Sequence, residues 1–172
     1  IMASCILIIV ISFILDGVLT NFLPYSVGNL SFFTPLTTLV SIVVIYKLFY
    51  HNHNEKKYYI LSFMVGFIYD FFYTNLLFFN GLLFLLIAYV TTLLYKQFGE
   101  SYLKILLNVL IIIVIYEVLT ALCILLFNLV PISINSVLYK ISHSLLFNLI
   151  YAELLYLILN LVPKKYKKIM IN

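Results

Sequence analysis

The sequence contains no arginine and no tryptophan, and only 9% of its residues are charged, against 65% that are hydrophobic. Without arginine the chain lacks the side chain that binds phosphates and base edges best, so its formal charge of +4 does not indicate nucleic-acid binding. So few charges also cannot cover the surface of a water-soluble domain. The composition therefore indicates a protein that lies in a lipid bilayer, where anionic lipids are the expected partners of its lysines.

The residue patterns of enzyme and metal sites are absent as well. The two cysteines, Cys5 and Cys123, lie singly in separate apolar runs, which argues against a disulfide framework or a thiolate metal site. His51 and His53 with Glu55 form a short polar stretch without a further metal ligand. No glycine-rich phosphate loop, zinc-protease helix or nucleophile elbow occurs. We therefore expect no catalytic residue, no metal, no cofactor and no enzymatic activity.

Apolar runs fill most of the chain, and six of them are close to the roughly 20 residues that cross a bilayer as a helix. At 172 residues there is no room for a separate globular domain, so we expect one all-α membrane domain over residues 1–172, with six transmembrane helices in one bundle. The end of the third run is poorly marked, and part of 73–79 is expected to be irregular and buried by protein. The expected spans are 2–23, 31–50, 58–79, 82–98, 105–130 and 137–162.

Lysines predict the orientation of these spans. Nine of the ten lie in alternate gaps between the apolar runs, and only Lys140, at the start of the expected span 137–162, falls on the other side. The lysine-bearing gaps are 47–57, 96–104 and 164–168. Because short cytoplasmic loops carry the excess of basic residues, we expect a multi-pass plasma-membrane protein with both termini in the cytoplasm. Tyr58 and Tyr95, near predicted span ends, are expected to anchor the membrane interface.

Four carboxylates interrupt the apolar runs: Asp16, Asp70, Glu117 and Glu153. A charged residue at the centre of a membrane helix costs about 2.5–3.5 kcal/mol on insertion scales, so each should face the bundle interior, a cavity or a partner protein. No lysine lies in the middle of a span as an obvious counter-ion, so we expect these groups to be protonated or to accept hydrogen bonds from neighbouring side chains. They either fix helix packing or serve recognition, and the sequence leaves both alternatives open.

Two sets of residues at four-residue spacing predict close helix contacts. Gly66 and Asp70 lie one helical turn apart and share a face, on which a glycine lets a second helix or backbone approach closely. This pairing makes Asp70 the strongest single candidate for a functional residue. Ser144, Asn148 and Ala152 repeat at the same spacing and form a small, polar stripe suited to contact between helices.

The stretch from Gly66 to Asp70, followed by Gly81, Leu85 and the pair Ala88–Tyr89, resembles the signature of the MreD family of rod shape-determining membrane proteins. That signature is a glycine-rich helix, an aspartate, a short loop, a glycine, and a helix with a leucine and an alanine–tyrosine pair. The end of the chain, with Asn148 followed by an apolar run, a proline and a basic tail, resembles the last helix of the family. The length, the six spans and the inner termini also fit.

The resemblance implies a non-enzymatic scaffold of the bacterial cell-shape and peptidoglycan elongation machinery in the plasma membrane. Such a protein would bind the single-span protein MreC and link RodA and its class B penicillin-binding partner to cytoplasmic MreB filaments. Polar groups in the outer half of the bundle would then dock a partner or shape a surface for it. The candidates for partner binding or packing are Asp16, Gly66, Asp70, Gly81 and Asn148.

Two other functions stay open on the sequence alone. The MreD family is similar in fold to the substrate-binding S components of energy-coupling factor vitamin transporters, so a vitamin-binding S component is the main alternative, and fold does not decide between the two. An ion-coupled transporter is the third hypothesis, and it requires that at least one of the four intramembrane acids titrates during turnover.

Overall fold

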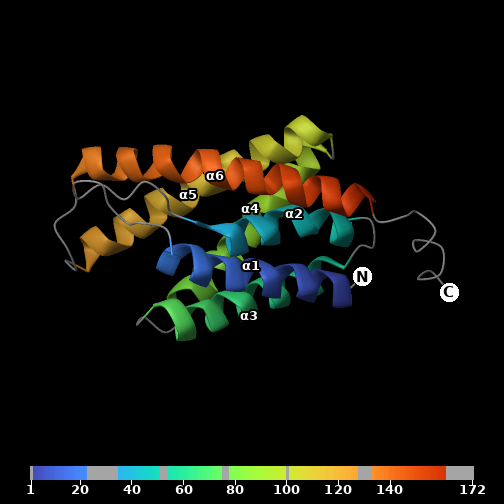
Figure 1. Cartoon of the computed structure of the whole chain (residues 1–172), viewed down its shortest axis with the longest axis horizontal. Helices are drawn as coiled ribbons and strands as arrows, with labels where there is room; N and C mark the ends of the chain where they lie inside the picture. Colours follow the sequence, from blue (N-terminus) through green and yellow to red (C-terminus); the bar gives the residue numbers. More distant parts are fainter. Residues whose placement is uncertain are drawn as a thin grey trace.

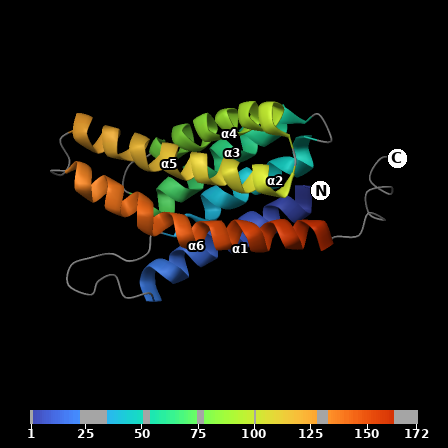
Figure 2. The same cartoon turned by 90° about the horizontal axis from the view of Figure 1, so that it is seen from above.

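Six helices make up the regular structure of the residues that the computed structural model describes, which are 2–22, 35–50, 54–74, 78–99, 101–127 and 133–161. The helices are α1 (Met2–Phe22), α2 (Thr37–Tyr50), α3 (Glu55–Tyr73), α4 (Phe79–Phe98), α5 (Tyr102–Leu126) and α6 (Ile134–Leu161). Consecutive helices run in opposite directions, and α1 begins at the end of the bundle where α6 ends (Figure 1, Figure 2). The all-α class expected from the sequence is confirmed for these residues.

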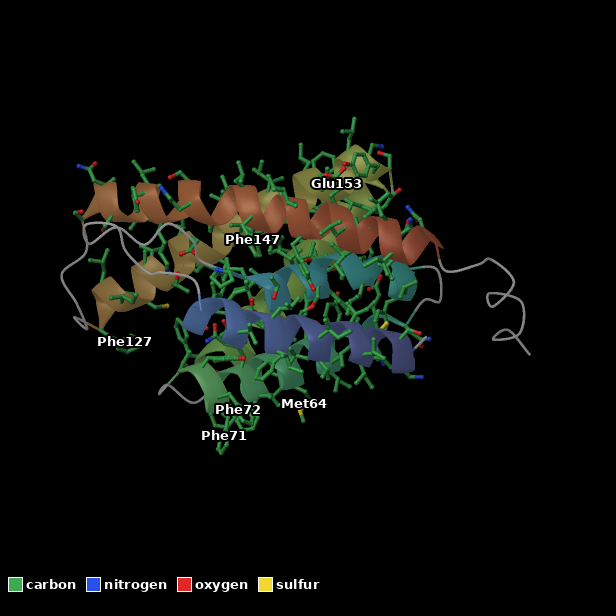
Figure 3. All side chains as sticks on the ribbon, viewed as in Figure 1. Met64, Phe71, Phe72, Phe127, Phe147 and Glu153 are labelled. Carbon is green, nitrogen blue, oxygen red and sulfur yellow. The ribbon has the colours of Figure 1, made fainter. Side chains whose placement is uncertain are left out.

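The outer surface of the bundle is apolar. Three helices, α4, α5 and α6, are long and apolar enough to cross a membrane. On α3, Phe71 and Phe72 are 71% and 67% exposed and lie on the outer side of the bundle (Figure 3). Because a protein in water rarely exposes large contiguous apolar surfaces, these faces indicate a lipid environment.

Most lysines of the described residues lie at one end of the bundle, where α2 and α4 finish and α3 and α5 begin. This end carries Lys47, Lys56, Lys57, Lys96 and Lys104. There, Lys96 forms an ion pair with Glu55 at 3.0 Å. Lys140 lies towards the opposite end, within the second turn of α6. A lysine-rich end is what the basic-loop rule requires of the cytoplasmic side, and the assignment of this end to the cytoplasm stays a prediction.

The second helix is short and central. All residues of α2 from Thr37 to Tyr46 are buried, and its 14 residues extend only about 21 Å at 1.5 Å per residue. That length is less than the ~30 Å hydrocarbon core of a typical bilayer. The predicted start of this helix at residue 31 is wrong, because Pro35 and Leu36 are not helical; residues 31–34 lie outside the described part of the chain. The N-terminus of α2 therefore lies inside the protein.

The turn between α3 and α4 comes earlier than predicted. Helix α3 ends at Tyr73 and not at residue 79, and α4 begins at Phe79 and not at residue 82. The backbone is extended at Thr74 and has a positive φ of 68° at Phe78, so irregular backbone does occur here. The expected burial is wrong for Phe78, which is 52% exposed, and 75–77 lie outside the described residues. Helices α5 and α6 each begin three residues earlier than predicted.

Tyrosines build the core at the lysine-rich end. Tyr46, Tyr58 and Tyr95 are fully buried, and the ring centroid of Tyr46 lies 4.7 Å from that of Tyr58 and 5.0 Å from that of Tyr95. The Tyr58 hydroxyl donates to the carbonyl of Ile42 at 3.2 Å. The predicted interfacial position of Tyr58 and Tyr95 is therefore wrong. Closeness to a helix end predicts depth in the membrane, but it does not predict which face of the helix turns inward.

Candidate functional site

A buried carboxylate from α1 binds the start of α2. One oxygen of Asp16, Oδ1, accepts hydrogen bonds from the backbone N–H and the hydroxyl of Thr37, both at 2.7 Å. The other oxygen, Oδ2, accepts the backbone N–H of Thr38 at 2.9 Å. The first N–H groups of a helix have no partner within the helix, and the helix dipole places partial positive charge there. Asp16, 1% exposed, thus caps α2 from a neighbouring helix.

The same helix terminus receives a second cap from α6. Asn148 is fully buried, and its Oδ1 accepts the backbone N–H of Leu36 at 2.9 Å. Its Nδ2 donates to the carbonyl of Ser144 at 2.7 Å, which fixes the orientation of the amide. The start of α2 is therefore held between α1 and α6, and the N–H groups of Leu36, Thr37 and Thr38 find acceptors in the protein interior.

We expect Asn148→Leu to lower the free energy of unfolding by about 1–3 kcal/mol, because the buried Leu36 N–H loses its acceptor. Thermal unfolding of the purified protein in detergent measures the effect. Asn160→Leu is the matched control: Asn160 lies two turns or more further along α6 and accepts an exposed hydrogen bond from Lys47 at 2.9 Å. Equal effects of the two substitutions would show that the cap contributes nothing.

A second buried carboxylate caps α4. Asp70 accepts hydrogen bonds from the hydroxyl of Thr74 and from Nδ2 of Asn80, both at 2.8 Å, and from the backbone N–H of Gly81 at 3.2 Å. Asn80 Oδ1 in turn accepts the hydroxyl of Tyr116 at 2.9 Å. This network connects α3, the start of α4 and the middle of α5. Asp70 is fully buried, so its contacts in the structure are all within the chain.

The two glycines of the family-like stretch meet at the same junction. A Cβ atom on Gly66 would lie 2.8 Å from the carbonyl carbon of Asn80 and 2.9 Å from Cα of Gly81. Real side chains do not approach a backbone so closely, so only glycine permits this contact between α3 and α4. Gly66, Asp70 and Gly81 therefore form one structural unit, in which the glycine brings the backbones together and the aspartate binds the approaching helix terminus.

The third buried acid has a counter-ion that the sequence analysis did not predict. Glu117 Oε2 lies 3.1 Å from Nζ of Lys140, and the two side chains are 2% and 46% exposed. The absence of a lysine counter-ion was therefore a wrong expectation. Because α5 and α6 are antiparallel neighbours, a residue near the end of α5 lies beside a residue near the start of α6. Glu117 and Lys140 lie at similar sequence distances before and after the α5–α6 connection. This spacing is the signal from which the pair could have been predicted.

The fourth acid faces outward. Glu153 is exposed on α6 and accepts a hydrogen bond at 2.7 Å from the hydroxyl of Tyr102, the first residue of α5. It lies on the outer side of the bundle (Figure 3). Of the three environments expected for an acid in an apolar run, which were the bundle interior, a cavity and a partner protein, the bundle interior is excluded for Glu153.

A cavity of about 340 Å³ lies beside the α2 terminus, with walls from α1, α3, α5 and α6. Its polar walls include the capped carboxylate of Asp16 and the Glu117–Lys140 pair, and its aromatic walls are tyrosines of α3 and α5. The described residues contain no group of three His, Cys, Asp or Glu side chains that could hold a metal ion. Carboxylate, ammonium and aromatic surfaces together suit a small polar ligand.

All five candidate residues predicted from the sequence are buried at two junctions: Asp16 and Asn148 at the start of α2, and Gly66, Asp70 and Gly81 at the start of α4. Glu117 was predicted only as one of four acids with a packing or recognition role, and its pairing with Lys140, the contribution of Tyr116 and the cavity that these residues line were not predicted.

A family model described as rod shape-determining protein MreD matches residues 3–166, nearly the whole chain. Comparisons with curated proteins and with solved structures gave no match. The matched region contains both capped junctions, the Glu117–Lys140 pair and the cavity. The chain therefore belongs to the MreD family of rod shape-determining proteins, a family with a structural role in cell shape and no known enzymatic one.

Proposed function

We propose that this protein is a non-enzymatic scaffold of the cell-wall elongation machinery, which crosses the plasma membrane six times as one domain with both termini in the cytoplasm. It binds an MreC-like single-span protein and links wall synthases, of the RodA and class B penicillin-binding type, to MreB filaments. The family match over residues 3–166 is the observation that carries this proposal. The lysine-rich end of the bundle supports the orientation.

The outer face of α6 is the partner surface that we propose. Leu146, Ile150, Glu153 and Leu157 follow one another at spacings of four, three and four residues, and all are exposed. They form one helix face in which a single carboxylate lies among apolar side chains. The carboxylate already accepts the hydroxyl of Tyr102. A transmembrane helix with a further hydroxyl or amide donor would satisfy its second oxygen, which is costly to leave against lipid. The single span of an MreC-like protein has the required form.

Site-specific photocrosslinking in the membrane tests this surface. A photoreactive residue at position 157 should crosslink to the MreC-like partner, while the same residue at position 64 on α3 should not. Position 64 is the matched control for position 157, because Met64 and Leu157 are 48% and 50% exposed on different helices.

We also expect Glu153→Ala to reduce co-purification with the partner in mild detergent. Recovery of the unmodified chain without any partner, under conditions that preserve other membrane complexes, would contradict the scaffold proposal itself.

A substrate-binding S component remains the second candidate, and the cavity of about 340 Å³ is the observation in its favour. It requires tight binding of a vitamin, so a panel of vitamins should then raise the unfolding temperature of the purified protein. No stabilisation by any vitamin, together with partner binding at α6, would exclude this alternative in favour of the scaffold.

A further inference from the structure

The Glu117–Lys140 cavity has the features of a ligand site that goes beyond the scaffold function. We propose that it binds a small zwitterionic group, with a primary ammonium against Glu117 and an anionic oxygen against Lys140. Three features support this site: the two charged side chains, the hydrogen bonds that already occupy Asp16, and the size and walls of the cavity.

Glu117 supplies an unused acceptor. Its Oε2 is paired with Lys140, but Oε1 is buried and has no hydrogen-bond partner among the described residues. A buried charged oxygen without a donor is costly, because it has lost the hydration that it would have in water. Because Glu117 lines the cavity, we place the donor of the ligand at Oε1. An ammonium group is the donor that best compensates a buried carboxylate oxygen.

Lys140 supplies the complementary donors. An ammonium carries three N–H groups, and one of them is directed to Glu117. The side chain is 46% exposed and lines the same cavity, so its remaining N–H groups are accessible to a ligand oxygen. A ligand with only an ammonium group would be repelled by the nearby ammonium of Lys140. A ligand that also carries an anionic oxygen can bind both Glu117 and Lys140.

The other acid in the cavity wall, Asp16, already accepts hydrogen bonds from the protein. Both oxygens of Asp16 accept hydrogen bonds from the start of α2, so this group does not compete for the ligand ammonium as strongly as Glu117 does. With both acids and Lys140 charged, the charges in the wall sum to −1, which disfavours a purely anionic ligand. The electrostatics therefore favour a ligand whose positive group lies deepest, at Glu117.

The volume of the cavity limits the size of the ligand. About 340 Å³ is at the lower end of the roughly 300–1,000 Å³ typical of small-molecule sites. A free amino acid fits this chemistry, and so does the ethanolamine phosphate headgroup of a membrane lipid. The shared feature is an ammonium a few atoms from an anionic oxygen.

Differential labelling of Lys140 in the intact protein tests the proposal without any substitution. The protein is placed in phosphatidylglycerol nanodiscs and treated with an amine-acylating reagent, and the ratio of acylation at Lys140 to that at Lys104 is measured by mass spectrometry. Lys104 is exposed at the other end of the bundle, so the ratio corrects for reagent consumed by amine probes. We expect β-alanine or glycerophosphoethanolamine to lower the ratio at least tenfold. Glycerophosphoglycerol, which lacks the amine, and ethanolamine, which lacks the anion, should have much smaller effects.

The source of the ligand is distinguished by lipid composition. If nanodiscs that contain phosphatidylethanolamine protect Lys140 without any soluble probe, the ligand is the lipid headgroup. If only the soluble zwitterions protect it, the ligand is a free solute. An unchanged ratio with every probe and in both nanodiscs would overturn the proposal, and so would equal protection by ethanolamine and the zwitterions.

A pair of variants tests the assigned residue. We expect Glu117→Gln to raise the dissociation constant of the protecting probe at least tenfold, which is about 1.4 kcal/mol. Glu55→Gln is the matched control, because Glu55 also pairs with a lysine, Lys96 at 3.0 Å, but lies at the opposite end of the bundle. Unchanged binding by Glu117→Gln would remove Glu117 from the site. If this variant does not fold, the labelling of the native protein decides.

Discussion

Asp16→Ala should prevent accumulation of the folded protein. The substitution leaves the N–H groups of Thr37 and Thr38 without their acceptor in the protein interior, while the Thr37 hydroxyl keeps the carbonyl of Ser12 at 2.7 Å. A buried donor that loses its partner costs about 1–3 kcal/mol, so the two together remove a large part of the total stability of about 5–15 kcal/mol typical of a folded domain. The yield of monodisperse protein after detergent extraction, followed by thermal unfolding of whatever is recovered, measures the loss.

The isosteric Asp16→Asn variant provides a graded comparison. Its single carbonyl oxygen can accept from only one side, and its amide N–H₂ would face a donor of α2. We expect an intermediate loss of stability, larger than that of Glu55→Ala at the exposed end of the bundle. If Asp16→Ala were as stable as Glu55→Ala, the carboxylate would not hold the start of α2.

Gly66→Ala should be nearly as damaging, although it adds a single methyl group. The new Cβ would overlap the backbone of Asn80 and Gly81, and backbone cannot move aside as a flexible side chain can. Overpacking of this kind typically costs about 1–3 kcal/mol and occasionally more. Here the displaced segment also carries the Asn80 and Gly81 contacts of Asp70, so we expect the upper end of this range or beyond. Unfolding temperature and expression level measure the effect.

Gly81→Ala is the matched control at the same junction. A Cβ on Gly81 would lie 3.4 Å from the ring of Phe63 and 3.5 Å from the backbone nitrogen of Phe67, which are ordinary contacts. Alanine is also the better helix former by roughly 1 kcal/mol in a helix interior. We therefore expect a near-neutral effect from Gly81→Ala. Similar losses in both variants would mean that helix flexibility, and not close approach, explains the glycines.

Helix number and the Gly66–Asp70 pairing could be predicted from the sequence because both follow from local spacing. A long run of apolar residues predicts a helix without knowledge of its neighbours, and two residues four positions apart share a face in any helix. The same reasoning could not predict where α2 begins. The residues before it, Pro35 and Leu36, are apolar like those of a span, and the helix starts at Thr37 because acceptors from α1 and α6 lie there.

The candidate site was less predictable than the fold, since its charges come together only in three dimensions. Glu117 and Lys140 are 23 positions apart in the sequence, and their contact depends on how α5 packs against α6. The outward position of Glu153 has the same origin, because its apolar sequence neighbours are alike on both faces of α6. Sequence analysis identified the four intramembrane acids correctly as unusual, but it assigned no counter-ion to Glu117 and no direction to Glu153.

The double cap on α2 has a consequence for synthesis of the protein. Leu36 and Asn148 are separated by 112 residues. At a translation rate of about 5–20 residues per second, the ribosome needs roughly 6–22 seconds to supply the asparagine after the leucine has been made. During that interval the N-terminus of the nascent second helix lacks one of its two caps. Its early partner is the aspartate of the first helix, and the second cap forms only after the last helix has been made.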